Sequence, residues 1–145
     1  MVIPDRDTAQ SIILHVDGLL TDSHALPGGL TAALRAYRAE LMRGCAGEAW
    51  ARPGHRTRYG RLADAIGRHI ADGTWQPGDR MPSAFYLAKT YYEQGKTVDR
   101  SLFVLAVRGH LTHELLTYYV LAPMLSLGRS IKRSFLRAKV RFYCV

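Results

Sequence analysis

The chain has few cysteines and no long apolar run. Its 145 residues include 2 cysteines, Cys45 and Cys144, too few and too far apart for the disulfide framework of a small secreted protein. The longest apolar runs, such as Ile12-Ile13-Leu14, are much shorter than the roughly 20 residues of a membrane span, so membrane association is not expected. The first residues include Asp5 and Asp7 rather than the basic segment of a signal peptide. We therefore expect a protein of the reducing cytoplasm.

Length and composition predict one folded domain, or a small domain with extensions. The chain is 48% hydrophobic and 10% aromatic, which is too apolar for a disordered segment. A chain of this length buries roughly 70% of its unfolded surface, so it needs neither a metal nor a disulfide to fold.

The charge is positive overall and uneven along the chain. The net charge is +8, with four basic and six acidic residues in 1–50, ten and six in 51–120, and six and none in 121–145. Such an excess favours an anionic partner, either nucleic acid or an acidic membrane surface, although it can also serve solubility alone.

Hydrophobic spacing predicts a helix over residues 29–43, where apolar side chains repeat at intervals of three and four. The repeating residues are Leu30, Leu34, Tyr37 and Leu41. Residues 44–57 contain several glycines and a proline, which is typical of a linker. Residues 1–26 show no pattern that assigns them.

A compact unit is predicted from residue 58 onward. It contains three helices and two short strands, over residues 58–72, 83–91, 95–107, 111–114 and 117–121. The apolar stripe of the third helix is Val98, Leu102 and Leu105. Glycines at 73 and 109 are placed to end the first and third helices.

This order of elements predicts a mainly α fold, a winged helix-turn-helix with a small β-hairpin wing and extra N- and C-terminal helices. The predicted parts are an N-terminal helical extension and linker (1–57), the winged helix-turn-helix (58–121) and a basic amphipathic tail (122–145). Three readings of the tail stay open: a docked helix with a solvated basic face, an arm on phosphates, or a helix on a membrane surface.

Residues 59–111 resemble the winged-helix DNA-binding domain of GntR-type transcription regulators. The family run Pro-Gly-Asp-Arg-Leu-Pro-Ser is matched by Pro77-Gly78-Asp79-Arg80-Met81-Pro82-Ser83, and later family positions fall on Leu87-Ala88, Thr97-Val98 and Gly109. The resemblance implies sequence-specific binding of double-stranded DNA by a homodimer that regulates transcription. The 24 residues after Leu121 are too few for the family's effector domain, so control by protein level or by a protein co-regulator is expected instead.

The chain departs from the family at several DNA-contact positions. Ala84-Phe85 stands where the family has Glu-Arg, Gln94-Gly95 where it has Ser-Arg, and Asp99 where an Arg commonly follows Thr-Val. The predicted wing also lacks the usual glycines. An alternative is therefore a protein–protein interaction module on a degenerate winged-helix fold.

Helix geometry places the basic side chains of residues 95–107 away from the apolar stripe. At about 100° per residue, Lys96 and Arg100 face outward near the start of the helix, together with Phe103 and Val107. The first turns of such a helix reach base edges in the major groove. The predicted DNA-binding residues are Arg80, Ser83, Gln94, Lys96, Thr97, Arg100 and His113. Phe103 and Val107 would either touch thymine methyl groups or mark a surface that another segment covers.

No catalytic or metal site is expected. Residues 12–23 resemble the first motif of haloacid-dehalogenase-type phosphatases, an apolar strand followed by Asp-x-Asp-Gly, but His15 stands where the nucleophilic Asp belongs and Leu19 replaces a Thr. We interpret this resemblance as coincidence. His110 and His113 have no further candidate ligands, so the sequence predicts neither a metal, a cofactor nor an enzyme.

Overall fold

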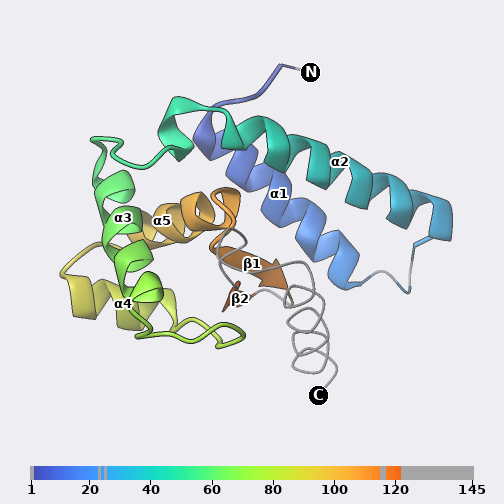
Figure 1. The fold of residues 1–145 in the computed structure, drawn as a ribbon. Coiled ribbons are helices and arrows are strands. Elements are labelled where there is room, and N and C mark those ends of the chain that lie inside the picture. Colours follow the sequence, from blue (N-terminus) through green and yellow to red (C-terminus); the bar gives the residue numbers. More distant parts are fainter. Residues whose placement is uncertain (1, 23, 25, 115–116, 122–145) are drawn as a thin grey trace, which may run out of the picture.

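In the computed structural model, residues 2–22, 24, 26–114 and 117–121 are described. The predicted tail, 122–145, lies outside the described residues. The elements are α1 (Arg6–Thr21), α2 (Gly28–Ala46), a 3₁₀ turn η2 (Ala49–Ala51), α3 (Arg58–Ala71), α4 (Ala84–Tyr91), α5 (Gly95–Val107), β1 (Leu111–Glu114) and β2 (Thr117–Val120). Helices α1 and α2 form one side of the molecule, and α3, α4 and α5 form the other (Figure 1).

Helices α3, α4 and α5 followed by the β1–β2 hairpin make a winged helix-turn-helix, as the sequence predicts. The hairpin is antiparallel, with Leu111 opposite Val120 and Glu114 opposite Thr117. The segment before α4 pairs with β2, since the Gly78 N–H donates to the Val120 carbonyl at 2.8 Å. The hairpin is therefore attached to the helix-turn-helix through the backbone.

Local signals in the sequence explain where the helices of this unit begin and end. Thr57 accepts a hydrogen bond from the Gly60 N–H and caps α3, and Ser83 accepts one from the Tyr86 N–H and caps α4. Gly73 follows α3 with a φ of +88°, a left-handed conformation that glycine adopts without a Cβ penalty.

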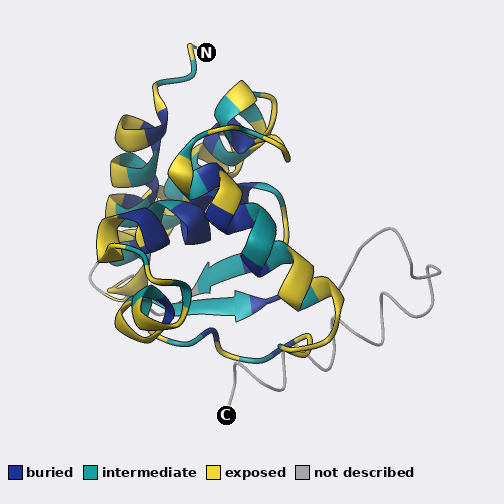
Figure 2. Cartoon of the chain, turned by 90° about the vertical axis from the view of Figure 1, so that its left-hand side faces the viewer, coloured by how far each residue is buried: buried dark blue, intermediate teal, exposed yellow. Residues whose placement is uncertain are grey.

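Two clusters of buried side chains make the core, one on each side of α5. The larger cluster joins α3, α4, α5 and the hairpin, and includes Ile66, Leu87, Val98 and Leu105. The smaller cluster joins α5 to the N-terminal helices, with Ala9, Ile13, Leu41, Cys45, Ala51, Phe103 and Val107. Figure 2 shows α5 as a largely buried helix between its neighbours.

Several predictions about the N-terminal part were incomplete. Residues 1–26, which the sequence left unassigned, contain α1, and the predicted linker contains the end of α2 and the turn η2. Phe103 and Val107, placed outward by helix geometry, are only 1% and 7% exposed. They are covered by another segment, one of the two possibilities raised by the sequence, because α1 and α2 pack against that face of α5.

Candidate nucleic-acid interface at the start of α5

The turn between α4 and α5 positions the first residues of α5 at the surface. Tyr92 ends α4 in a left-handed conformation with φ of 55°, and the next N–H, of Glu93, donates to the Ala88 carbonyl at 2.9 Å. Gln94 then takes an extended conformation and starts α5, and its side chain makes no capping hydrogen bond. The N-terminal end of α5 therefore comes directly after the turn and has no side-chain cap.

Only the N-terminal end of α5, residues 95–100, has exposed side chains. Thr97, Val98 and the run Ser101–Val107 are buried, because the two core clusters cover opposite faces of the helix. Gly95, Lys96 and Asp99 are exposed and Arg100 is partly exposed. A ligand that binds α5 must therefore contact it through residues 95–100.

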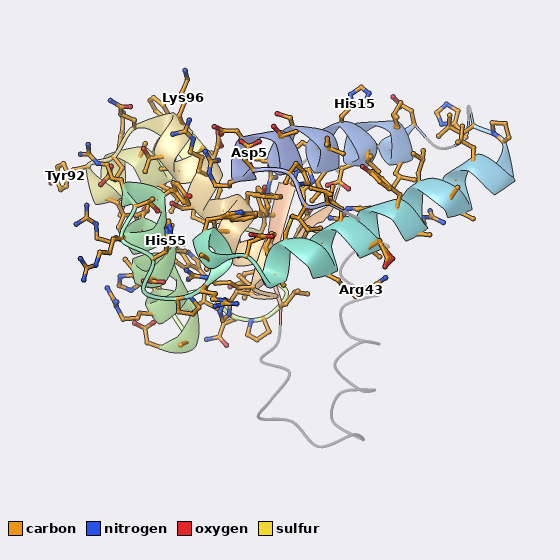
Figure 3. All side chains as sticks on the ribbon, turned by 90° about the horizontal axis from the view of Figure 1, so that it is seen from above. Asp5, His15, Arg43, His55, Tyr92 and Lys96 are labelled. Atoms are coloured by element: carbon orange, nitrogen blue, oxygen red, sulfur yellow. The ribbon has the colours of Figure 1, made fainter. Side chains whose placement is uncertain are left out.

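Lys96 and Arg100, which the sequence predicts as base-reading residues, both lie in this exposed end of α5. Lys96 is exposed and projects away from the body of the molecule (Figure 3). The Arg100 side chain is 39% exposed, and its Nε lies 3.7 Å from Oδ1 of Asp7. Gln94, just before the helix, is also exposed.

Arg80 and Ser83, the predicted phosphate contacts, lie at the entry to α4 and are both exposed. The Arg80 backbone forms a bridge with Tyr119 of the hairpin, so its position depends on β2. The Ser83 hydroxyl accepts the capping hydrogen bond from Tyr86 at 3.2 Å. Since a hydroxyl also carries one donor, Ser83 can cap α4 and donate to a phosphate.

Thr97 and His113, the other two predicted contacts, lie inside the molecule. Thr97 is 8% exposed. The His113 side chain is also 8% exposed, and its Nδ1 lies 2.8 Å from Oδ2 of Asp17. The predicted contact surface does not include them, because neighbouring elements cover both side chains.

Around His113, a small polar cluster joins the hairpin to the N-terminal helices. The other oxygen of Asp17 accepts a hydrogen bond from Nε of Arg38 at 2.5 Å, and the Tyr118 ring lies 4.8 Å from the His113 ring. Burial, followed by the charges of Asp99 and Asp17, raises the pKa of Tyr118 above its ordinary value. The cluster therefore fixes the hairpin against α1 and α2.

The N-terminal end of α1 also borders the exposed turn of α5, which sequence reasoning missed. The Gln10 amide donates to the Asp99 carbonyl at 3.5 Å, and Asp7 approaches Arg100. The spacing of Ala9, Ile13 and Val16, all buried, is typical of one helix face, and this spacing was the signal in the sequence that could have predicted α1.

Residues 12–21 are helical, so the strand of the phosphatase-like motif is absent there.

A second surface feature lies beside α4. An open pocket of about 630 Å³ is lined by residues that include Trp75, Pro82, Ser83, Tyr86 and Tyr91. Among the described residues, no group of three or more His, Cys, Asp or Glu side chains could hold a metal ion. No helix in the described part of the chain is long and apolar enough to cross a membrane.

No protein-family model matches the chain, and no curated protein matches it. Among solved structures it is similar to YtrA from Sulfolobus acidocaldarius, a GntR-family transcription factor, at 25% sequence identity and a TM-score of 0.41. The likeness covers 62% of this chain and 78% of that chain. The winged-helix assignment made above depends on the order and pairing of the elements themselves.

Proposed function

We propose that this chain binds double-stranded DNA sequence-specifically and regulates transcription, with the N-terminal end of α5 in the major groove. One observation supports this most: Lys96 and Arg100 lie one helical turn apart on the part of α5 that the described residues leave open. Arg or Lys can donate two hydrogen bonds to guanine, and each good bidentate contact discriminates by about 1–3 kcal/mol.

Exposed hydrogen-bond donors near the N-terminal end of α5 are placed to contact the phosphate backbone of the bound DNA. Arg80 and Ser83 at the entry to α4, and Gln94 before α5, are exposed donors. We take residues 58–121 as the DNA-binding unit, and this unit includes most of the chain's ten basic residues between 51 and 120. Nonspecific attraction to phosphates would supply much of the affinity.

We also propose that the protein acts in the cytoplasm as a homodimer, under control by its own level or by a protein co-regulator. Helix-turn-helix proteins usually bind pseudo-palindromic sites as two-fold dimers. A candidate dimer face lies on α2, where Leu30 and Tyr37 are 46% and 42% exposed. Leu19 at the end of α1 is a further exposed apolar residue, at 38%.

The first test is binding of the whole protein to a labelled random-sequence duplex, followed by fluorescence anisotropy over a range of salt concentrations. If about six phosphates are contacted, the plot of log K against log salt has a slope near −5. A slope near zero, or no binding at low salt, contradicts the proposal.

The second test asks whether α5 reads bases. Duplexes selected by the protein from a random pool supply a specific sequence, and Arg100→Ala should reduce the preference for it over random DNA by about 10-fold. Arg35→Ala is the matched control, because Arg35 is an exposed residue of α2 and its loss changes the net charge equally. An equal loss of affinity on both duplexes would make Arg100 a phosphate contact.

The alternative function is a protein-interaction module. It is favoured by the exposed aromatic residues around α4, since Phe85, Tyr86 and Tyr92 are 71%, 58% and 91% exposed. Tyr86 also lines the pocket beside α4, and aromatic side chains are common anchors in protein interfaces. Failure to retain random duplex DNA at low salt would favour this function over DNA binding.

A further inference from the structure

The N-terminal end of α1 lies beside residues 95–100, the only part of α5 that the described part of the chain leaves exposed. Figure 3 shows Asp5, at this end of α1, on the same side of the molecule as Lys96. Two contacts join the elements: Gln10 donates to the Asp99 carbonyl at 3.5 Å, and Asp7 Oδ1 lies 3.7 Å from Arg100 Nε. An acidic residue therefore neighbours a side chain that the proposed function assigns to DNA.

The structure holds Asp7 in this position. Arg6 is 8% exposed, with its guanidinium 4.5 Å from the centre of the Tyr59 ring. The same guanidinium donates to Oε1 of Gln10 at 3.1 Å and to Oδ1 of Asp7. Oδ1 of Asp7 therefore lies between two arginines, one anchored in the α3 surface and one on α5.

Buried packing keeps the N-terminal end of α1, which carries Asp7, close to α5. Ala9 and Ile13 of α1 are 0% and 2% exposed and belong to the cluster that contains Phe103 and Val107. Since the buried face of α1 packs on α5, its N-terminal end cannot move away without exposing that cluster. Asp7 is thus held at the border of the surface that we propose for DNA binding.

We propose that Asp7 competes with DNA for Arg100 and so limits the affinity of α5 for duplex DNA. This inference rests on the proposed function and adds a control built into the N-terminal helix. In the free protein the Asp7 carboxylate forms an ion pair with the Arg100 guanidinium. In the complex a phosphate or a guanine takes its place, so the free energy of the Asp7–Arg100 ion pair opposes binding.

The experiment compares the Kd of Asp7→Asn and wild-type protein for the same labelled duplex at low salt. The amide keeps an oxygen that accepts from Arg6 but removes the charge. An exposed ion pair contributes about 0.2–1 kcal/mol, so binding should tighten by about 1.4- to five-fold. Asp7→Ala, which removes the whole group, should give a similar gain.

Two controls isolate the contact from net charge. Asp22→Asn makes the same charge change at the other end of α1, where Asp22 is exposed, and should leave the Kd nearly unchanged. In an Arg100→Ala background, the gain from Asp7→Asn should disappear, because the competed side chain is gone. Urea unfolding of each variant confirms that the comparison is between folded proteins.

An unchanged Kd for both Asp7 variants overturns the inference, and so does an equal gain from Asp22→Asn or a gain that persists without Arg100. Wild-type binding is the separate readout for the proposed function. If wild-type protein binds DNA and the Asp7 variants bind equally, only the competition is refuted. If neither wild-type nor variant binds, both are refuted.

Discussion

Replacing Phe103 by Ala tests whether the N-terminal helices and the winged helix form one cooperative unit. Phe103 is on α5 and is 1% exposed. Its ring stacks on Trp50 with centroids 6.0 Å apart and planes at 20°, and the surrounding cluster comes from α1, α2 and η2. Truncating a buried Phe to Ala costs about 3–5 kcal/mol, of which the stacked pair accounts for about 0.5–1.5 kcal/mol.

That cost is a large part of the stability of a domain, which is about 5–15 kcal/mol. The assay is urea unfolding followed by circular dichroism and by tryptophan fluorescence. Phe103→Ala should lower the free energy of unfolding by about 3–5 kcal/mol, and the midpoint of thermal unfolding by about 10–16 °C.

Phe85→Ala is the matched control, because it makes the same chemical change on a side chain that is 71% exposed. The only ring contact of Phe85 that the described residues show is Lys89 Nζ, 4.4 Å from the ring centre, and exposed contacts of this kind contribute about 0.5–1 kcal/mol. A loss below about 1 kcal/mol for Phe103→Ala, similar to that of the control, would refute the packing of α1 and α2 on α5.

Three further predictions concern the other buried and capping groups. Arg108→Ala should lower the free energy of unfolding, measured in urea, by about 3 kcal/mol. The Arg108 side chain is 8% exposed and donates to Asp64 and to the Ala51 carbonyl, both at 2.7 Å. A loss below about 0.5 kcal/mol would show that these contacts contribute nothing. Burial raises the pKa of Cys45 to about 11. In a Cys144→Ser variant, the folded protein should therefore resist a thiol reagent at pH 8 and react only above about pH 10 or on unfolding. Rapid reaction of the folded protein at pH 8 would contradict this. Ser83→Ala should lower stability by about 1 kcal/mol through loss of the α4 cap, and unchanged stability would show that the Tyr86 N–H is satisfied without it.

The winged helix could be predicted closely because its signals are local. The predicted helix at 95–107 matches α5, and the others differ by a residue or two at their ends. Capping residues, positive-φ glycines and a stripe of apolar side chains each act within one turn of the chain. Such features can be read without knowledge of distant contacts.

The N-terminal packing could not be predicted in the same way because it depends on distant contacts. Nothing near Phe103 in the sequence shows that α1 and α2 cover it, and the pairing of His113 with Asp17 joins residues far apart in the chain. Helix geometry correctly placed Val98, Leu102 and Leu105 on a buried face of α5, but it placed Phe103 and Val107 outward although both are buried. It could not say which face stays open, because that is decided by which other elements pack there.

Under the proposed function, the burial of α5 on two faces limits how much DNA sequence one copy of the chain can read. With Lys96 and Arg100 as the base-reading side chains, two contacts at about 1–3 kcal/mol each give about 2–6 kcal/mol of discrimination. Specific binding usually exceeds nonspecific binding by about 4–10 kcal/mol. A second subunit on a two-fold-related half-site would double the first figure and reach that range, so the short exposed end of α5 is consistent with the homodimer proposed above. If so, charge placed on the α2 face, as in Tyr37→Glu, should weaken specific binding far more than binding to random DNA, and analytical ultracentrifugation should show the loss of the dimer.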